Sequence, residues 1–205
     1  MSKSEKMRYL RNAPTLFPLE SYTAQLKIIM ENQPSSPSHN FLDELIQRDR
    51  SIAYEMIARF VPMETTAEIS TFLKAFIAEE KKGDDYISEE GEEAVEKIAR
   101  SLLERGRESI NAKNYLTAAE TAFAVILAIE PELCMVLDEG WTYQMIIIES
   151  FEYLDQIGKL PLSPDVFDLL LQQTTKHFNS IREEDRYVDD KWKELMLTFK
   201  NGYTQ

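Results

Sequence analysis

The chain has few cysteines, few glycines and no long apolar run. Cys134 is the only cysteine among the 205 residues, so the chain can form neither an intrachain disulfide nor a thiolate cluster for zinc. The densest apolar patch, at 145–148, is followed by Glu149, which leaves no run of about 20 apolar residues to cross a bilayer. Residues 1–20 also lack the apolar run of about 7–15 residues that a signal peptide needs. These absences predict a soluble protein of the reducing cytoplasm.

Basic residues are also scarce. The chain has 23 lysines and arginines against 36 aspartates and glutamates, which gives a formal net charge of -13. A surface this negative repels phosphate groups, so we expect neither nucleic acid nor a membrane as a partner. Hydrophobic residues make up 43% of the chain and aromatic residues 10%, which is enough to build a buried core.

The six glycines and the prolines fall between stretches with helical periodicity, which predicts an all-α protein of about seven to nine helices. We expect Thr65 or Thr66 to cap one helix, because a hydroxyl there can accept a hydrogen bond from the first turn. The acidic run at 84–97 is interpreted first as a helix opening, since carboxylates are favoured at the positive end of the helix dipole. The predicted helices span 20–32, 40–62 as one helix or a pair, 65–82, 89–112, 114–131, 141–157, 165–178 and 189–199.

The clearest change in composition is the stretch QPSSPSHN at 33–40, whose proline and serine content is typical of a loop. It predicts a division of the chain into three parts. Residues 1–33 form a basic arm and a first helix, residues 34–40 form a linker, and residues 41–205 form a single helical domain.

The stretch NAKNYLTAAETAFAVILAIEP at 111–131 has the most specific spacing in the chain. Phe123 follows Ala119 by four residues and Pro131 follows eight residues later, which matches the pattern A-x3-F…P. A small residue at Ala119 lets two helices approach closely, Phe123 fills the space between hairpins, and Pro131 ends the second helix. Residues 98–165 thus resemble a tetratricopeptide repeat. The resemblance implies stacked antiparallel helical hairpins with a tetratricopeptide-like centre, and a role in binding other proteins.

The repeat period gives a mixed result. A shift of about 34 residues carries Leu103 to Leu137 and Gly106 to Gly140, which agree, but it carries Ala119 to a tyrosine. A generic antiparallel helical hairpin explains the same spacing, and the sequence leaves the two interpretations open.

The stretches RSLLERG, TAAETAF and LDEGW…ESFEYL are also similar to the helical region that accompanies SWIM zinc-finger domains in some bacterial proteins. The finger itself needs three cysteines and a histidine. Because this chain has one cysteine, the resemblance brings over neither zinc nor finger-mediated binding.

No stretch carries a recognisable catalytic motif. The chain lacks G-x-S-x-G, a glycine-rich phosphate loop and H-E-x-x-H. His39 and His177 have no second histidine or cysteine at ligand spacing, so neither is expected to bind a metal. Cys134 stands between Leu133 and Met135, which favours a packed thiol over a nucleophile. We therefore expect no catalytic residue, no cofactor and no metal site.

Two rows of carboxylates leave one alternative open. Glu149, Glu152 and Asp155 are three residues apart on one predicted helix, so they share a face that either meets solvent or holds a hard cation. Asp189, Asp190 and Glu194 allow the same two interpretations. The cation-binding one predicts a small all-α enzyme or ligand-binding protein with a carboxylate-lined pocket.

The interval from Lys113 to Lys159 has the strongest regional bias, because only those two residues are basic. Aromatic residues are interleaved with the acids, which predicts an acidic groove with aromatic anchors for a basic or amphipathic peptide. In the alternative interpretation the aromatic residues belong to the core and the acids face water, and we favour that one for Phe151. The eight acids are Glu120, Glu130, Glu132, Asp138, Glu139, Glu149, Glu152 and Asp155.

The resulting hypothesis is a non-enzymatic adaptor. Its predicted partner-binding residues are Trp141, Tyr143, Tyr153, Glu149 and Glu152. Self-association into a homo-oligomer remains a further possibility, which a mass measurement distinguishes.

Overall fold

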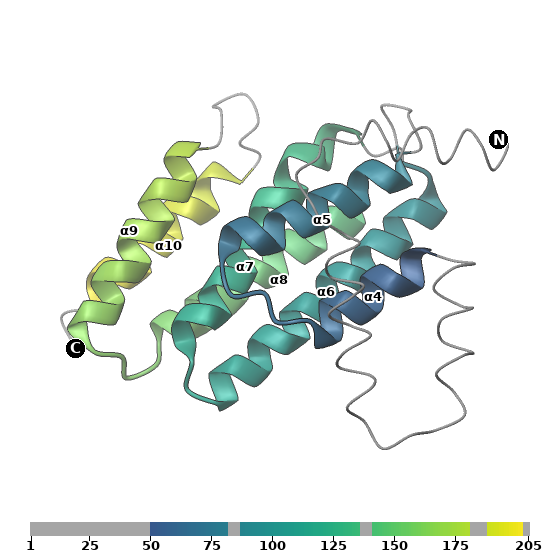
Figure 1. Cartoon of the computed structure of the whole chain (residues 1–205). Helices are drawn as coiled ribbons and strands as arrows, with labels where there is room; N and C mark the ends of the chain where they lie inside the picture. Colours follow the sequence, from purple (N-terminus) through teal and green to yellow (C-terminus); the bar gives the residue numbers. More distant parts are fainter. Residues whose placement is uncertain (1–49, 82–86, 136–140, 181–187, 203–205) are drawn as a thin grey trace, which may run out of the picture.

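The computed structural model describes residues 50–81, 87–135, 141–180 and 188–202, and the regular structure in these ranges is helical, with no β-strand (Figure 1). This confirms the all-α prediction. The basic arm, the helix predicted at 20–32 and the linker at 34–40 lie outside the described residues. The described elements are α4 (Arg50–Phe60), α5 (Thr66–Glu80), α6 (Glu89–Asn111), α7 (Tyr115–Ile129), the 3-10 helix η1 (Glu130–Met135), α8 (Trp141–Gly158), α9 (Pro164–Ser180) and α10 (Asp189–Gly202).

The helix starts follow from local sequence. The Thr65 hydroxyl accepts a hydrogen bond from the Glu68 backbone N–H at 3.2 Å, and the Glu68 carboxylate accepts one from the Thr65 N–H at 3.2 Å. This reciprocal pair is a capping box, so the predicted cap is confirmed. α6 begins after Ser88 with three glutamates in its first turn, which confirms the acidic run as a helix opening.

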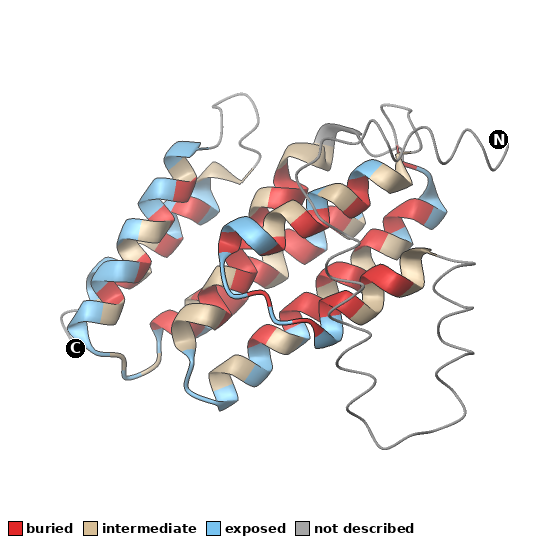
Figure 2. Cartoon of the chain, viewed as in Figure 1, coloured by how far each residue is buried: buried red, intermediate tan, exposed pale blue. Residues whose placement is uncertain are grey.

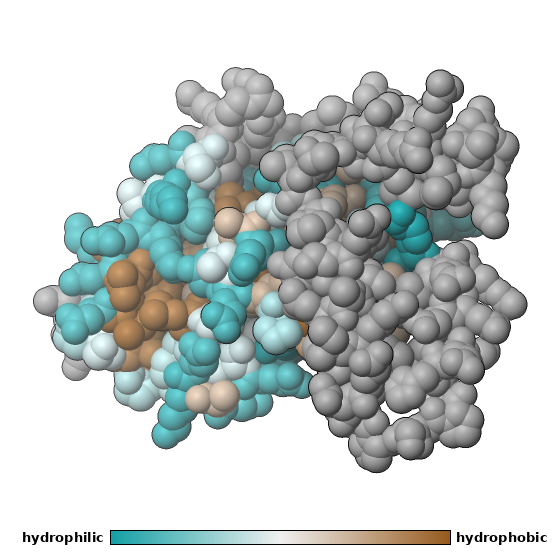
Figure 3. Space-filling view, in the orientation of Figure 1, coloured by the Kyte–Doolittle hydropathy of each residue, from teal (hydrophilic) through white to brown (hydrophobic). Residues whose placement is uncertain are grey.

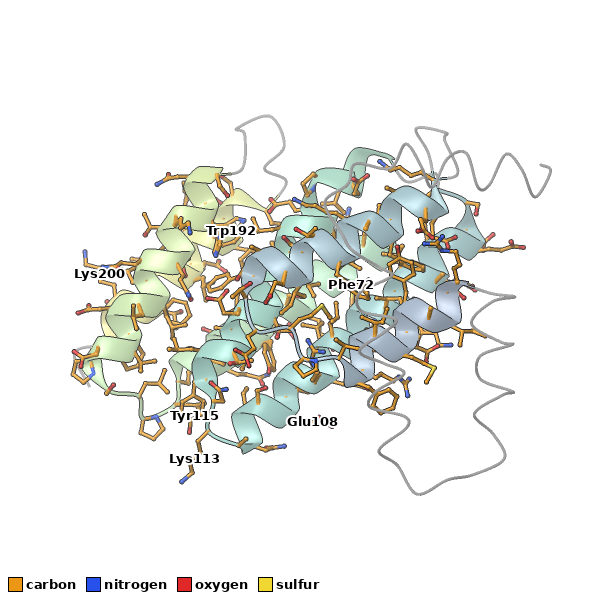
Figure 4. The ribbon with its side chains drawn as sticks, viewed as in Figure 1. Phe72, Glu108, Lys113, Tyr115, Trp192 and Lys200 are labelled. Carbon is orange, nitrogen blue, oxygen red and sulfur yellow. The ribbon has the colours of Figure 1, made fainter. Side chains whose placement is uncertain are left out.

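Helices α6 and α7 form an antiparallel hairpin joined by a turn at Lys113, which has a left-handed φ of 62°. The Lys113 N–H donates to the Ile110 carbonyl and the Asn114 N–H donates to the Ser109 carbonyl, both at 2.8 Å. These bonds satisfy the last carbonyls of α6. Figure 4 shows Lys113 at the tip of the hairpin, close to Tyr115.

Helix α7 lies at the centre of the fold and packs against α5, α6, α8 and α9 (Figures 1 and 2). Ten of its 15 residues are buried. Alanine occupies half of those buried positions, and small side chains allow neighbouring helices to approach closely. By comparison, α8 buries nine of its 18 residues and leaves one face open.

The last two helices pack against each other, with α9 also touching α7 and α10 touching α8. Trp192 of α10 is fully buried. Its ring stacks on Phe123 with centroids 6.2 Å apart and meets the Phe151 ring edge-on at 5.1 Å. The prediction that Phe151 is a core residue is therefore confirmed.

Gly106 sits where α6 meets α7 and α8. A Cβ atom at this position would lie 2.9 Å from the Tyr153 hydroxyl oxygen and 3.5 Å from Thr121 Cβ. Tyr153 is itself buried, so its ring cannot swing aside cheaply. The glycine thus sets the distance between α6 and α8.

We expect Gly106→Ala to lower the free energy of unfolding by about 1–2 kcal/mol, although alanine is the better helix former by about 1 kcal/mol. Tyr153→Phe removes the oxygen that the new methyl group meets and leaves Tyr153 Cζ, at 3.4 Å, as the nearest atom. Gly106→Ala in the Tyr153→Phe background should then be neutral or stabilising. Urea denaturation of the four proteins measures this cycle, and an equal cost of Gly106→Ala in both backgrounds would contradict the packing argument.

Candidate partner-binding site

The five predicted partner-binding residues all lie on α8, but the structure does not bring them together on one surface. Tyr143 is fully buried and Tyr153 is only 3% exposed, so the prediction that they anchor a partner is wrong. Helical geometry puts both on the face that also buries Ile146 and Ser150. Their hydroxyl groups have no hydrogen-bond partner among the described residues, and burial raises the pKa of both.

Glu149 is also unavailable, because it joins α8 to α6. Its carboxylate forms ion pairs with Arg100 and, at 2.6 Å, with Arg107. Arg100 in turn pairs with Glu96 at 2.8 Å. Glu149 therefore holds two helices together and serves neither as an open carboxylate for a partner nor as a cation ligand.

Of the five predicted residues, only Trp141 and Glu152 are exposed. Trp141 is joined by Met145, which was not among the predicted residues; these two lie one helical turn apart and are 62% and 52% exposed. Ile148 is half-buried and Glu152 is exposed on the same face, and no hydrogen bond or ion pair engages Glu152 within the described part of the chain. We name these four residues the Trp141 stripe.

Most of the acidic residues between Lys113 and Lys159 form contacts within the fold. On α7, the Glu120 carboxylate accepts a hydrogen bond from the Thr66 N–H at 2.7 Å, at the start of α5. The fully buried Glu130 accepts one from the Trp192 indole N–H at 3.1 Å and one from the Val188 N–H at 3.3 Å, at the start of α10. These two acids stabilise the positive ends of neighbouring helices.

Two more of the acids also have partners. Glu132 pairs with Lys81 at 2.5 Å, and Asp155 pairs with Lys159 and accepts a hydrogen bond from the Thr198 hydroxyl at 3.1 Å. Asp138 and Glu139 lie outside the described residues. The acidic groove is therefore not built from the acids that the sequence suggested.

The exposed acids beside the stripe come from α6. The Glu149 ion pairs and the contact of Gly106 with Tyr153 place α8 alongside α6 in the same direction. Met145 stands one turn before Glu149 and Glu96 stands one turn before Arg100, so the Arg100–Glu149 ion pair places the first turns of α6 next to the first turns of α8. Glu89, Glu90 and Glu93 are exposed in the preceding turns of α6. The acidic run at 84–97 carries the sequence signal for these residues, although a helix opening was its first interpretation and a binding site its second.

Cation binding has no geometric support in this region. Among the described residues, no group of three or more His, Cys, Asp or Glu side chains could hold a metal ion. No described helix has the length and apolar character of a transmembrane span. A shallow, open depression along α9 includes none of the predicted site residues; it is lined by Asp168, Leu171, Gln172, Thr175, Lys176 and Asn179.

His177 is buried against Phe123, with ring centroids 5.0 Å apart. Burial lowers the pKa of His177, Lys176 lowers it further, and Glu120 acts in the opposite direction. A folded-state pKa below the unfolded value of about 6.5 means that the unfolded chain binds the proton more tightly. The stability from neutral His177 is therefore complete above that value and is lost as the pH falls through the folded-state pKa.

We expect the free energy of unfolding to fall as the pH is lowered below about 6.5, and to fall less steeply in His177→Gln, which does not titrate. Urea denaturation at several pH values measures both slopes. Equal slopes for the two proteins would show that the buried imidazole does not contribute to this dependence.

Comparisons with known proteins return no match, whether the chain is compared with family models, with curated proteins or with solved structures.

Proposed function

We propose that this protein is a non-enzymatic interaction module that binds a basic, amphipathic segment of another protein on the Trp141 stripe and the adjoining first turns of α6. The observation that supports this most directly is that Trp141 and Met145, one turn apart on α8, are both more than half exposed. Tryptophan is the residue type most enriched among interface hot spots, and methionine adapts to varied apolar partners.

Charge favours a basic partner over an acidic one. Glu152 is exposed on the Trp141 stripe, and Glu89, Glu90 and Glu93 are exposed in the first turns of α6, which packs against α8. The whole chain carries a net charge of -13, which attracts basic segments and speeds their association. A basic amphipathic helix therefore matches the surface in both its apolar and its charged parts.

Other exposed apolar residues lack this combination. Figure 3 shows an apolar area over α9, where Leu169 is 44% exposed, but no aromatic residue of α9 is exposed there. Phe60 on α4 and Leu197 on α10 are exposed on other helices. The same proposal treats the α6–α7 hairpin as tetratricopeptide-like, on the spacing of Ala119, Phe123 and Pro131. It also places the protein in the cytoplasm, which the single cysteine supports.

The test is fluorescence anisotropy with a panel of labelled basic amphipathic helical peptides and their charge-reversed versions. We expect wild type to bind members of the basic panel, with affinity reduced about tenfold or more in Trp141→Ala and weakened by added salt. Trp141 is exposed, so the variant should remain folded by circular dichroism. Phe60→Ala removes an aromatic side chain of similar exposure (56%) from α4 and is the matched control.

Two results would refute the proposal. One is equal binding by wild type and Trp141→Ala, and the other is no preference for basic over charge-reversed peptides. Sedimentation equilibrium on the same samples identifies self-association, which would make a second copy of the chain the occupant instead.

A further inference from the structure

Residues 1–18 of this chain have the chemistry expected of the proposed partner. Their charged residues are Lys3, Lys6, Arg8 and Arg11 against the single acid Glu5, in a chain whose overall net charge is -13. Apolar side chains stand among the basic ones, in the order KMRYLR at 6–11. The segment thus combines basic and apolar side chains, and its positive charge is complementary to the exposed acids of α6 and the Trp141 stripe.

The chain before Arg50 leaves the described fold at the end where the stripe begins. Arg50, the first residue of α4, donates a hydrogen bond to Glu79 at 2.9 Å in the last turn of α5. The next residue, Glu80, lies against Gly91 in the first turn of α6, since a Cβ on Gly91 would be 3.4 Å from Glu80 Cβ. Glu80 also lies near enough to Tyr143, at the start of α8, to reinforce the effect of burial in raising the pKa of that hydroxyl. The starts of α4, α6 and α8 therefore lie at one end of the bundle.

The intervening chain is long enough to reach the stripe. Residues 19–49 make up 31 residues, which span about 45 Å even if every one of them were helical. The whole of α8, with 18 residues, is about 27 Å long. A tethered segment of this length acts at an effective concentration that can reach the millimolar range, so it competes with a free partner even when its own affinity is weak.

We propose that residues 1–18 bind the Trp141 stripe within the same chain and compete there with the basic partner. This inference rests on the proposed function for its consequence, since the contact would regulate access to that site. The intramolecular contact itself has a separate readout, because it shields Trp141 from solvent whether or not any partner exists.

The experiment compares two full-length proteins, wild type and a variant with Lys3, Lys6, Arg8 and Arg11 all changed to Glu. Acrylamide quenching of tryptophan fluorescence reports Trp141, because Trp192 is fully buried, and Trp141→Phe supplies the background. A matched control carries the same change of charge at four exposed lysines elsewhere, Lys113, Lys176, Lys191 and Lys200. We expect Trp141 to be quenched about twofold more readily in the variant than in wild type or the control, and high salt to abolish the difference.

A second measurement tests whether the four substitutions alter the quenching of Trp141 for a reason other than loss of the contact. A synthetic peptide of residues 1–18, added to the charge-reversed variant, should restore the protection of Trp141. The charge-reversed variant should also bind the basic peptide panel about tenfold more tightly than wild type. Equal quenching of wild type, variant and control would overturn the inference, even if the panel binds. Protection of Trp141 without binding of any panel peptide would uphold the inference and overturn the proposed function.

Discussion

Glu130→Ala is expected to lower the free energy of unfolding by about 3 kcal/mol or more. Glu130 is fully buried, and its two carboxylate oxygens accept hydrogen bonds from the Val188 N–H and the Trp192 indole N–H. Removing the carboxylate leaves the buried Trp192 N–H and the half-buried Val188 N–H without this acceptor, and a buried donor that loses its partner costs about 1–3 kcal/mol. The loss should be local at first, because these bonds attach α10 to the end of α7.

Glu130→Gln distinguishes the contribution of the negative charge from that of the hydrogen bonds. Its amide oxygen can still accept one of the two bonds, while its NH2 group faces a donor. We therefore expect an intermediate loss of about 1–2 kcal/mol. The readouts are urea denaturation and the near-ultraviolet circular dichroism of Trp192, whose ring is held between Phe123 and Phe151.

The matched control is Glu152→Ala, which removes an exposed glutamate from α8 without disturbing a described contact. It should leave the unfolding midpoint unchanged. If Glu130→Ala were as mild as this control, the buried carboxylate would not hold the C-terminal helices in place.

The helices could be predicted from the sequence because their signals are local. The Thr65 cap, the glutamates after Ser88 and the turn at Lys113 each involve residues within about one helical turn of one another. Local interactions of this kind are present in the sequence itself, so the boundaries of α5 and α6 could be read from it.

The site was harder to predict because exposure depends on which helices cover which face. The apolar side chains of α8 point to most sides of the helix, so the sequence alone could not show that Met145 faces solvent while Tyr143 faces the core. That difference arises because α6, α7 and α10 pack against α8 and cover only part of its circumference.

The acids were misassigned for a related reason. Glu120 and Glu130 lie in and directly after an otherwise apolar helix, and an acid in such a setting needs a buried partner. The sequence held this signal, but the partners are Thr66 and Trp192, which are 54 and 62 residues away. Regional charge therefore overstated the negative surface, and the exposed acids beside Trp141 come instead from α6.

Arg105→Ala should have an effect as large as that of Glu130→Ala, at the opposite side of the core. The Arg105 guanidinium donates to the carbonyls of Ala58 at 3.0 Å, Val61 at 2.7 Å and Met63 at 3.4 Å, where α4 ends. A cation is favoured at the negative end of a helix, and these backbone groups belong to buried residues. Burial lowers the pKa of Arg105, but an arginine remains charged at physiological pH.

We expect Arg105→Ala to lower the free energy of unfolding by about 3 kcal/mol, since hydrogen bonds from a charged donor are worth about 1.5–3 kcal/mol each. Arg105→Lys keeps the charge but cannot reach several carbonyls with a planar fork, so it should lose about half as much. Arg107→Ala, two residues away on the same helix, is the control, because its exposed ion pair with Glu149 is worth less than about 1 kcal/mol.

Hydrogen exchange adds a local readout to this prediction. Without Arg105, the amides of α4 should exchange faster than those of α7, because α4 depends on its contacts with α6 for its position. Equal exchange rates for the amides of α4 and α7 would show that Arg105 stabilises the fold without positioning α4.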